Sequence, residues 1–291
     1  MDQYLIAIVT FTAIYGMIGL GLNLQWGLTG LVNLGQVAFF AVGAYASALL
    51  LLAGAHFIVA LAAAAMLPAA LATLVALITP RLREDYLAIV TLGLAEIIRL
   101  VFLNEKWIAG GPDGLTGIPR PLLGSATPSE SAWLFMLATL AALFVFFMIN
   151  WRIATFPIGR VLKAIRSDEI LATSLGKNVL RFKTQMLAVG ASMAGIAGAF
   201  YASYLTFISP AMFTAQVSLN VLVAVLIGGQ GNALGVLIGT AIVTCILEGT
   251  RFIKDYVSIL GGVELAALRM IIIGLALIVI VLVRYRKASV R

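Results

Sequence analysis

Charge is scarce in this sequence. Only 11% of the 291 residues are Asp, Glu, Lys or Arg, whereas 62% are hydrophobic. Soluble domains carry roughly a quarter charged residues, so this chain has too little polar surface to cover a water-soluble core. Apolar runs of about 17–25 residues recur along it, and each is long enough to cross a bilayer as a helix. The composition therefore predicts an all-α, polytopic integral membrane helical bundle.

Histidine and cysteine are nearly absent. His56 and Cys245 are the only residues of their types, so neither an intrachain disulfide nor the usual His/Cys zinc site can form. The sequence also lacks a Gly-x-Ser-x-Gly elbow and a Gly-x-x-x-x-Gly-Lys-Ser/Thr phosphate loop. We therefore expect a protein that is not an enzyme, and any ATP that powers it must bind to another chain.

The apolar segments predict about nine membrane crossings. The first is Tyr4–Leu22 and the last is Leu265–Val283. The number lies roughly between eight and ten, because the two short apolar pieces within Ser218–Leu247 also fit a broken or re-entrant helix.

Lys and Arg gather in three places between the predicted spans: the turn at Arg81 and Arg83, the loop Trp151–Lys183 and the tail Arg284–Lys287. An alternating path puts all three on one side, which the positive-inside rule makes the cytoplasmic side. The N-terminus is then outside and the C-terminus inside. The net charge of +7 reflects this topology and does not indicate nucleic-acid binding.

The most polar interval between two spans is Gly159–Lys183. Within it, Ser167 as N-cap, followed by Asp168 and Glu169, predicts the start of a helix of about two turns. Gly176 predicts the end of that helix, because glycine readily adopts the left-handed conformation. Such a polar, capped helix predicts a cytoplasmic projection that contacts another protein. The alternative is an ordinary cytosolic loop whose basic residues only fix the topology.

Carboxamides interrupt two of the predicted spans. Asn33 and Gln36 are spaced i, i+3 on one face of the second span, which begins near Leu31. Gln230 and Asn232 lie in the break between two short apolar segments. A carboxamide in hydrocarbon needs a partner or a water-filled path. The four residues therefore predict either weak contacts with a substrate or hydrogen bonds that tie helices together.

Two opposite charges fall inside the fourth predicted span, Tyr86–Leu103. Glu96 and Arg99 are spaced i, i+3 and can pair on one helix face. An isolated charge costs about 2.5–3.5 kcal/mol at the bilayer centre, so we expect an ion pair that faces the interior of the bundle. This interpretation favours a structural clamp over a contact with substrate.

Four separated blocks resemble the permeases of bacterial branched-chain amino acid ABC importers, and their M-type subunit in particular. The resemblance runs from about Gly19 to Leu282, with Val236 and Thr240 where the family usually has a proline and a Gly-Ala pair. The blocks read LNLQWGLTGLVNLGQVAFFAVGAYASALL (residues 22–50), GGPDGLTGIP (110–119), AIRSDEILATSLGKNVLRFK (164–183) and GGQGNALGV (228–236).

The resemblance implies a single transmembrane permease domain over residues 1–291 in the bacterial inner membrane, with a cytoplasmic coupling loop at about 151–183. It implies four kinds of partner: a second homologous permease subunit, ATP-binding subunits that hold ATP and Mg, an external (periplasmic) binding protein, and membrane lipid. No cofactor is expected in this chain. Coupling to the ATPase is implied for Arg166, Ser167, Asp168, Glu169, Ala172 and Gly176.

The substrates implied by the resemblance are leucine, isoleucine and valine. Close relatives carry urea and short-chain amides, which is the main alternative. A secondary carrier is disfavoured because intramembrane acids are few and no proton-relay chain of Asp, Glu and His is present. An intramembrane enzyme would need a nucleophile–base pair, and a scaffold subunit would not need polar, glycine-broken spans.

Overall fold

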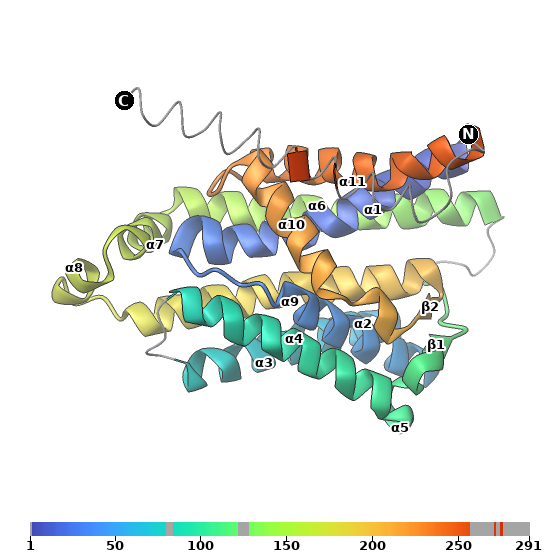
Figure 1. Ribbon diagram of the computed structural model, residues 1–291, viewed down its shortest axis with the longest axis horizontal. Coiled ribbons are helices and arrows are strands. Elements are labelled where there is room, and N and C mark those ends of the chain that lie inside the picture. The colour runs from blue at the N-terminus through green and yellow to red at the C-terminus, as the bar shows by residue number, and fades with distance from the viewer. Residues whose placement is uncertain (1, 80–83, 122–127, 257–270, 272–273, 276–291) are drawn as a thin grey trace.

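The computed structural model describes residues 2–79, 84–121, 128–256, 271 and 274–275, and nearly all of them are helical (Figure 1). The elements are α1 (Asp2–Leu22), η1 (Asn23–Leu28), α2 (Gln36–Leu52), α3 (Phe57–Ile78), α4 (Glu84–Asn104), α5 (Lys106–Ala109), η2 (Gly111–Asp113), β1 (Leu115–Thr116), α6 (Pro128–Thr155), α7 (Pro157–Ser167), α8 (Glu169–Ser174), α9 (Val179–Leu205), β2 (Phe207–Ile208), η3 (Pro210–Met212), α10 (Ala215–Gly228) and α11 (Ala233–Tyr256).

The predicted all-α membrane bundle is confirmed. Among the described residues, 6 helices are long and apolar enough to cross a membrane, and two apolar helices are shorter. The predicted last span, the turn at Arg81 and Arg83, and the basic tail lie outside the described residues. The long helices are Gln3–Leu28, Phe57–Ile78, Tyr86–Asn104, Glu130–Thr155, Val179–Leu205 and Pro210–Gly228, and the shorter ones are Gln36–Leu52 and Ala233–Glu248.

Helix α9 is the centre of the bundle and packs against α1, α2 and α3. Small residues allow this close packing: a Cβ on Gly43 of α2 would overlap the backbone of Gly195 of α9. Lipid tails are as apolar as leucine, so membrane helices associate through such close contacts and through hydrogen bonds. In the block of residues 22–50, Gly43 is therefore required by packing against α9, and Gly35 by a similarly close approach to Thr91 of α4.

The first span ends in irregular backbone that is buried in protein. Helix α1 runs into the π-helical turn η1, and the chain is non-helical from Gly30 to Gly35 before α2 begins at Gln36. The prediction that the second span starts near Leu31 was therefore wrong. The Asn33 Oδ1 atom accepts a hydrogen bond of 2.9 Å from the Gly35 N–H, and this local turn competes with helix.

Helices α10 and α11 form an antiparallel hairpin joined by the turn 229–232. The turn contains Gly229 and Gly231 at φ values of +98° and +81°, which favour glycine. A Cβ on Gly235 would overlap the Gly228 carbonyl oxygen, so the two helices touch at this point. Helix α11 also continues to Tyr256, beyond the predicted end of its apolar segment at Leu247.

The two ends of the bundle differ. Figure 1 shows α7 and α8 projecting at one end, whereas α5, β1, β2 and the start of α1 lie at the other. At that second end β1 pairs antiparallel with β2, with Leu115 opposite Ile208. Gly114 has a φ of +70° and comes so close to Ile208 that a Cβ would overlap its carbonyl oxygen. The glycine-rich segment 110–119 thus forms a set of tight turns.

Candidate functional site

The polar interval between α6 and α9 contains two helices, not one. Helix α7 starts with Pro157 at its first turn, a position where the missing N–H costs nothing. The short helix α8 follows, and Asp168 is its N-cap: the Asp168 Oδ1 atom accepts hydrogen bonds of 2.9 Å and 3.0 Å from the N–H groups of Ile170 and Leu171. Figure 1 shows α8 at the tip of the projection.

The prediction that Ser167 caps this helix was wrong by one residue. Ser167 is the last residue of α7, and its hydroxyl donates to the Lys163 carbonyl oxygen at 3.0 Å. The reason is that α7 uses Ser167 to complete its own final turn, which leaves the neighbouring carboxylate of Asp168 to cap α8.

The predicted end of the capped helix is confirmed. Gly176 has a φ of +76°, and its N–H donates to the Thr173 carbonyl oxygen at 2.9 Å. The Lys177 N–H donates to the Ala172 carbonyl oxygen at 3.1 Å, which completes a Schellman motif. Ala172 itself is buried, at 4% exposure. Both ends of α8 are therefore fixed by its own residues.

Helix α8 and its C-cap residue expose large apolar side chains at the surface of the projection. Ile170, Leu171 and Leu175 are 81%, 59% and 70% exposed. These residues lie beside polar and charged ones, in a segment too hydrophilic to lie in hydrocarbon. Exposed apolar side chains rimmed by polar residues are typical of surfaces that bind another protein, a membrane or a ligand.

Arg166 connects the projection to the membrane-embedded helices. Its Nη1 atom donates to the Gly27 carbonyl oxygen in η1 at 2.5 Å, and its Nη2 atom donates to Gln230 Oε1 in the α10–α11 turn at 2.6 Å. One guanidinium thus joins α7 to both breaks in the helices. Asn232 instead stays local, because its Oδ1 atom accepts from the Gly235 N–H at 3.3 Å.

Asn33 and Gln36 are brought together, although not as neighbours on one helix. The Asn33 Nδ2 atom donates to Gln25 Oε1 at 2.8 Å and to Gln36 Oε1 at 2.9 Å. The Nε2 atoms of Gln25 and Gln36 donate to the carbonyl oxygens of Leu187 and Gly190 in α9 at 3.0 Å and 3.1 Å. The three carboxamides are buried and hold the break after α1 against α9.

A second carboxamide pair joins α1 to α6. The Asn23 Nδ2 atom donates to Asn150 Oδ1 at 3.1 Å, and Asn150 Nδ2 donates to the Leu20 carbonyl oxygen at 2.8 Å. Asn23 Oδ1 also accepts from the Gly231 N–H at 2.8 Å, so it reaches the α10–α11 turn as well. Sequence reasoning missed Asn150, and its position at the end of an apolar run was the available signal.

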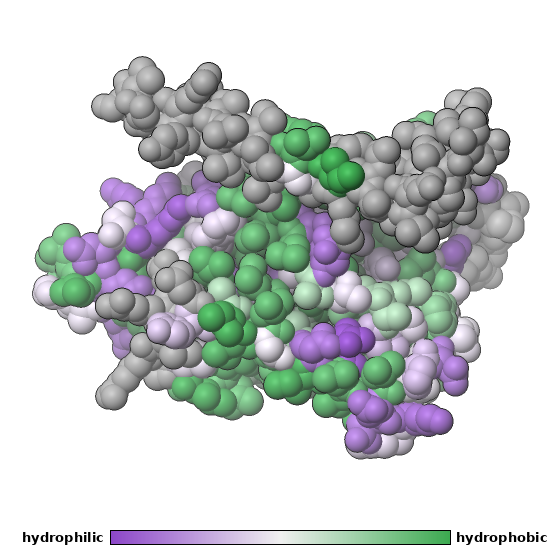
Figure 2. Space-filling view, in the orientation of Figure 1, coloured by the Kyte–Doolittle hydropathy of each residue, from purple (hydrophilic) through white to green (hydrophobic). Residues whose placement is uncertain are grey.

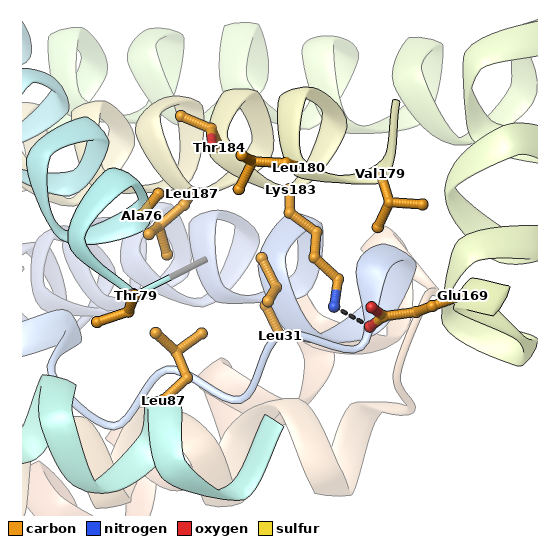
Figure 3. A pocket seen from close by; sticks show the side chains of 10 residues that line it. All are labelled: Leu31, Ala76, Thr79, Leu87, Glu169, Val179, Leu180, Lys183, Thr184 and Leu187. Carbon is orange, nitrogen blue, oxygen red and sulfur yellow. Dashed lines mark hydrogen bonds and ion pairs between the residues drawn. The ribbon is translucent and has the colours of Figure 1, made fainter. Parts of the chain in front are cut away.

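A cavity of about 190 Å³ lies beside α8 (Figure 3). Figure 3 shows the Lys183 side chain reaching from α9 toward the Glu169 carboxylate, with which it forms an ion pair. Glu169 therefore ties α8 to α9 from the side of this cavity. The lining residues are Leu31, Ala76, Thr79, Leu87, Glu169, Val179, Leu180, Lys183, Thr184 and Leu187.

The Glu96–Arg99 ion pair is present, with Arg99 Nε 3.0 Å from Glu96 Oε2 and Arg99 Nη2 2.5 Å from Glu96 Oε1. The prediction that it faces the interior of the bundle was wrong, because the two side chains are 50% and 25% exposed. Helix α4 turns a different face toward α2, and that face buries Leu87, Thr91 and Ala95.

No described part of the chain gathers three or more His, Cys, Asp or Glu side chains into a group that could hold a metal ion. The polar features of the described residues are therefore the projection, the two carboxamide clusters and the ion pair. Arg166 of the projection donates a hydrogen bond to η1, and Asn23 of the second carboxamide cluster accepts one from the α10–α11 turn. The Glu96–Arg99 ion pair on α4 is separate from these contacts.

Comparisons with known proteins match most of the chain. The family described as "Branched-chain amino acid transport system / permease component" matches residues 4–281. The high-affinity branched-chain amino acid transport system permease protein LivM of Escherichia coli (strain K12) is 38% identical over 280 residues, which cover 88% of this chain and 66% of that protein. The chain thus spans just under two thirds of the length of this relative.

Of two more distant relatives, one is again named as a branched-chain amino acid permease and the other is not. The probable branched-chain amino acid transport permease protein LivM of Methanocaldococcus jannaschii is 27% identical over 80% of this chain and 77% of that protein. The autoinducer 2 import system permease protein LsrC of Photorhabdus laumondii is 29% identical over 56% of this chain and 48% of that protein. No solved structure matches the chain.

Proposed function

The chain belongs to the family of branched-chain amino acid transport system permease components, and we propose that it is the membrane permease subunit of an ATP-driven ABC importer. In this proposal it moves leucine, isoleucine and valine into the cytoplasm. The observation that carries the proposal is the capped helix α8, which exposes Ile170, Leu171 and Leu175 at the tip of a polar projection. That surface suits insertion into a groove of an ATP-binding subunit.

The proposal places α7 and α8 in the cytoplasm and the β1–β2 end outside a bacterial inner membrane. The basic residues around α8 support this orientation under the positive-inside rule. The N-terminus of α1 is then outside, because it lies at the end of the bundle opposite to α8 (Figure 1). The basic residues are Arg160, Lys163, Arg166, Lys177, Arg181 and Lys183.

The partners follow from the same proposal. ATP-binding subunits hold ATP and Mg, a second homologous permease subunit completes the membrane part, and an external binding protein delivers the substrate. This chain supplies no cofactor of its own. Its task is mechanical: it converts a movement of the ATP-binding subunit into a rearrangement of the membrane helices.

Arg166 is the proposed link in that conversion. Hydrogen bonds from a charged donor contribute about 1.5–3 kcal/mol each, and Arg166 makes one to each helix break. A displacement of α7 therefore pulls on the Gly27 carbonyl and on the α10–α11 turn together. Irregular backbone at both places can change conformation without unwinding a whole helix.

The docking surface is tested by replacing Ile170 and Leu171 with Ser. We expect the double variant to insert in the membrane normally but to lose co-purification with the ATP-binding subunit, because the apolar contact is removed. Trp107→Ser is the matched control, since Trp107 is 82% exposed on α5 at the other end of the bundle. Normal co-purification of the double variant would contradict docking through α8.

The alternative substrates implied by the sequence resemblance are urea or short-chain amides. Uptake of labelled leucine in competition with unlabelled valine, urea or acetamide separates the two readings. We expect valine to reduce the uptake of labelled leucine, and urea and acetamide to leave it unchanged. A secondary carrier would instead accumulate leucine from an ion gradient without any ATP-binding subunit.

A further inference from the structure

The Glu96–Arg99 pair lies deep in α4 on a surface that no described residue covers. At 1.5 Å per residue, Glu96 is about 12 Å from the Asn104 end of the helix and about 18 Å from the Glu84 end. A hydrocarbon core is about 30 Å thick, so both side chains fall within membrane depth. Half of the Glu96 side chain is nevertheless exposed.

Lipid is an unfavourable neighbour for this pair. A lone charge is costly in hydrocarbon, and charged residues in spans therefore face water-filled cavities or protein. Pairing reduces the cost, but the exposed carboxylate oxygens of Glu96 and N–H groups of Arg99 keep unused hydrogen-bonding capacity. The surface must meet something polar.

Gly93 lies one turn before Glu96 on the same helix face. A Cβ added to Gly93 would meet no atom within 4 Å, so packing within the chain does not require glycine here. Glycine is also a poorer helix former than alanine, so helix stability does not explain the glycine at this position.

The neighbouring helix adds further polar groups to this face. Helix α10 contacts α4, and its exposed Gln216 Nε2 atom donates to Asn220 Oδ1 at 3.1 Å. Figure 2 shows hydrophilic patches within the hydrophobic surface of this face, one over α4 and one beside α10. Ile97 and Leu100 of α4 supply exposed apolar surface beside the charges, at 60% and 42% exposure.

We propose that this α4 strip (Gly93, Glu96, Ile97, Arg99 and Leu100) forms a wall of the translocation passage and contacts a zwitterionic amino acid in transit. The Arg99 guanidinium receives the substrate carboxylate, and the Glu96 carboxylate receives its ammonium group. Ile97 and Leu100 face the branched side chain.

The inference rests on the proposed import function and narrows its substrate class. A zwitterion can exchange hydrogen bonds with both members of the pair, so neither Glu96 nor Arg99 is left unpaired during passage. Urea and acetamide can also accept and donate hydrogen bonds, but they carry no charge and cannot replace the ionic attraction that each member of the pair gives up. The strip therefore favours α-amino acids over neutral amides.

Accessibility of Gly93→Cys tests the position of the strip. The assembled complex, with Cys245→Ser in this chain, is treated in vesicles with a hydrophilic, membrane-impermeant thiol reagent. We expect labelling at position 93 that leucine slows. Met66→Cys in α3 is the matched control, because Met66 is 70% exposed on an apolar helix and should remain unlabelled.

Two outcomes of the labelling would overturn the proposal. Labelling only in the absence of the second permease subunit would mean that the strip is buried by that subunit. Labelling only by a lipophilic reagent would mean that it faces lipid. Neither outcome depends on transport, so a failure here is distinct from a failure of the import function.

The double variant Glu96→Gln/Arg99→Gln tests the chemistry. We expect leucine uptake per complex to fall about tenfold or more, as for the loss of one strong polar contact, while assembly and ATP hydrolysis persist. If the pair is only a clamp, neutral carboxamides replace it at lower cost and uptake stays normal, which would contradict the proposal. Leucine uptake by the unmodified complex tests the import function separately.

Discussion

In the proposed mechanism, Arg166 is the most important single residue of the projection. Its guanidinium reaches two acceptors, the Gly27 carbonyl oxygen and Gln230 Oε1, which belong to different breaks. A planar fork with several fixed N–H groups suits two separate acceptors, whereas an ammonium group is a single point of charge. The charge of the side chain matters less here than its shape.

Arg166→Lys should therefore uncouple the two breaks while it keeps the positive charge. We expect leucine-stimulated ATP hydrolysis to fall about tenfold, as for the loss of one charge-assisted hydrogen bond, with membrane insertion unchanged. The assay is ATP hydrolysis by the reconstituted complex with and without loaded binding protein. Arg160→Lys is the control, because Arg160 is an exposed basic residue of the same helix. Normal stimulation of ATP hydrolysis in Arg166→Lys would show that Arg166 does not take part in coupling.

At the residue scale, the sequence predicted that a polar group needs a partner but not which partner. Asn33 and Gln36 had to be satisfied in a chain this apolar, and they are. Their partners Gln25 and the α9 carbonyl of Gly190 could not be predicted, because they depend on how distant helices cross. Glu96 and Arg99 paired as predicted, but their exposure depends on which face of α4 packs on α2.

Among the elements, α8 is short but well defined. It has only 6 residues, too few to be stable as an isolated helix, so its ends must hold it. Asp168 supplies the N-terminal cap and Gly176 the C-terminal turn. The Glu169–Lys183 ion pair then fixes its direction relative to α9 (Figure 3).

Asp168→Ala should loosen α8, whereas Ser167→Ala should not. Loss of an N-cap side chain costs about 1 kcal/mol, and Asp168 is the side chain that accepts from the first free N–H groups of α8. Hydrogen exchange of the Ile170 and Leu171 amides measures the effect, and we expect about fivefold faster exchange in Asp168→Ala. Faster exchange in Ser167→Ala instead would indicate that Ser167 is the N-cap of α8.

Sequence patterns predicted the long elements better than the short ones. The spans follow from long apolar runs, and the end of α8 follows from Gly176. Helix α7 was missed because its apolar residues are interleaved with Arg and Lys, and this amphipathic pattern was interpreted as part of a charged loop. The start of α2 was placed too early, at Leu31, because the Asn33 turn depends on hydrogen bonds to Gln25 and Gln36 that form only in the folded chain.

Across the whole molecule, the projection of α7 and α8 lies at one end of the bundle, and α5, β1 and β2 lie at the other (Figure 1). Arg166 donates hydrogen bonds to η1 and to the α10–α11 turn, and Asn23 of η1 donates to α6 and accepts from the Gly231 N–H of that turn. In the proposed mechanism, a movement of α8 is transmitted to these elements through this cluster. This arrangement suits a subunit that is moved by a partner on one side of the membrane.

The orientation is tested with single cysteines in a Cys245→Ser background. Ser174→Cys, on α8, should react with an impermeant reagent only from the cytoplasmic side. Asp113→Cys, in the exposed turn η2 at the opposite end, should react only from outside. Intact cells compared with inside-out vesicles give the two accessibilities. Reaction of both cysteines from the same side would contradict the proposed path of the chain.

The central claim is that this chain is the permease of an importer driven by ATP bound elsewhere. The most direct measurement is leucine uptake into proteoliposomes that contain the chain with its ATP-binding subunits, second permease subunit and binding protein. Uptake should require ATP and should vanish when the ATP-binding subunits are left out. ATP-independent uptake by the chain alone, driven by an ion gradient, would contradict the account.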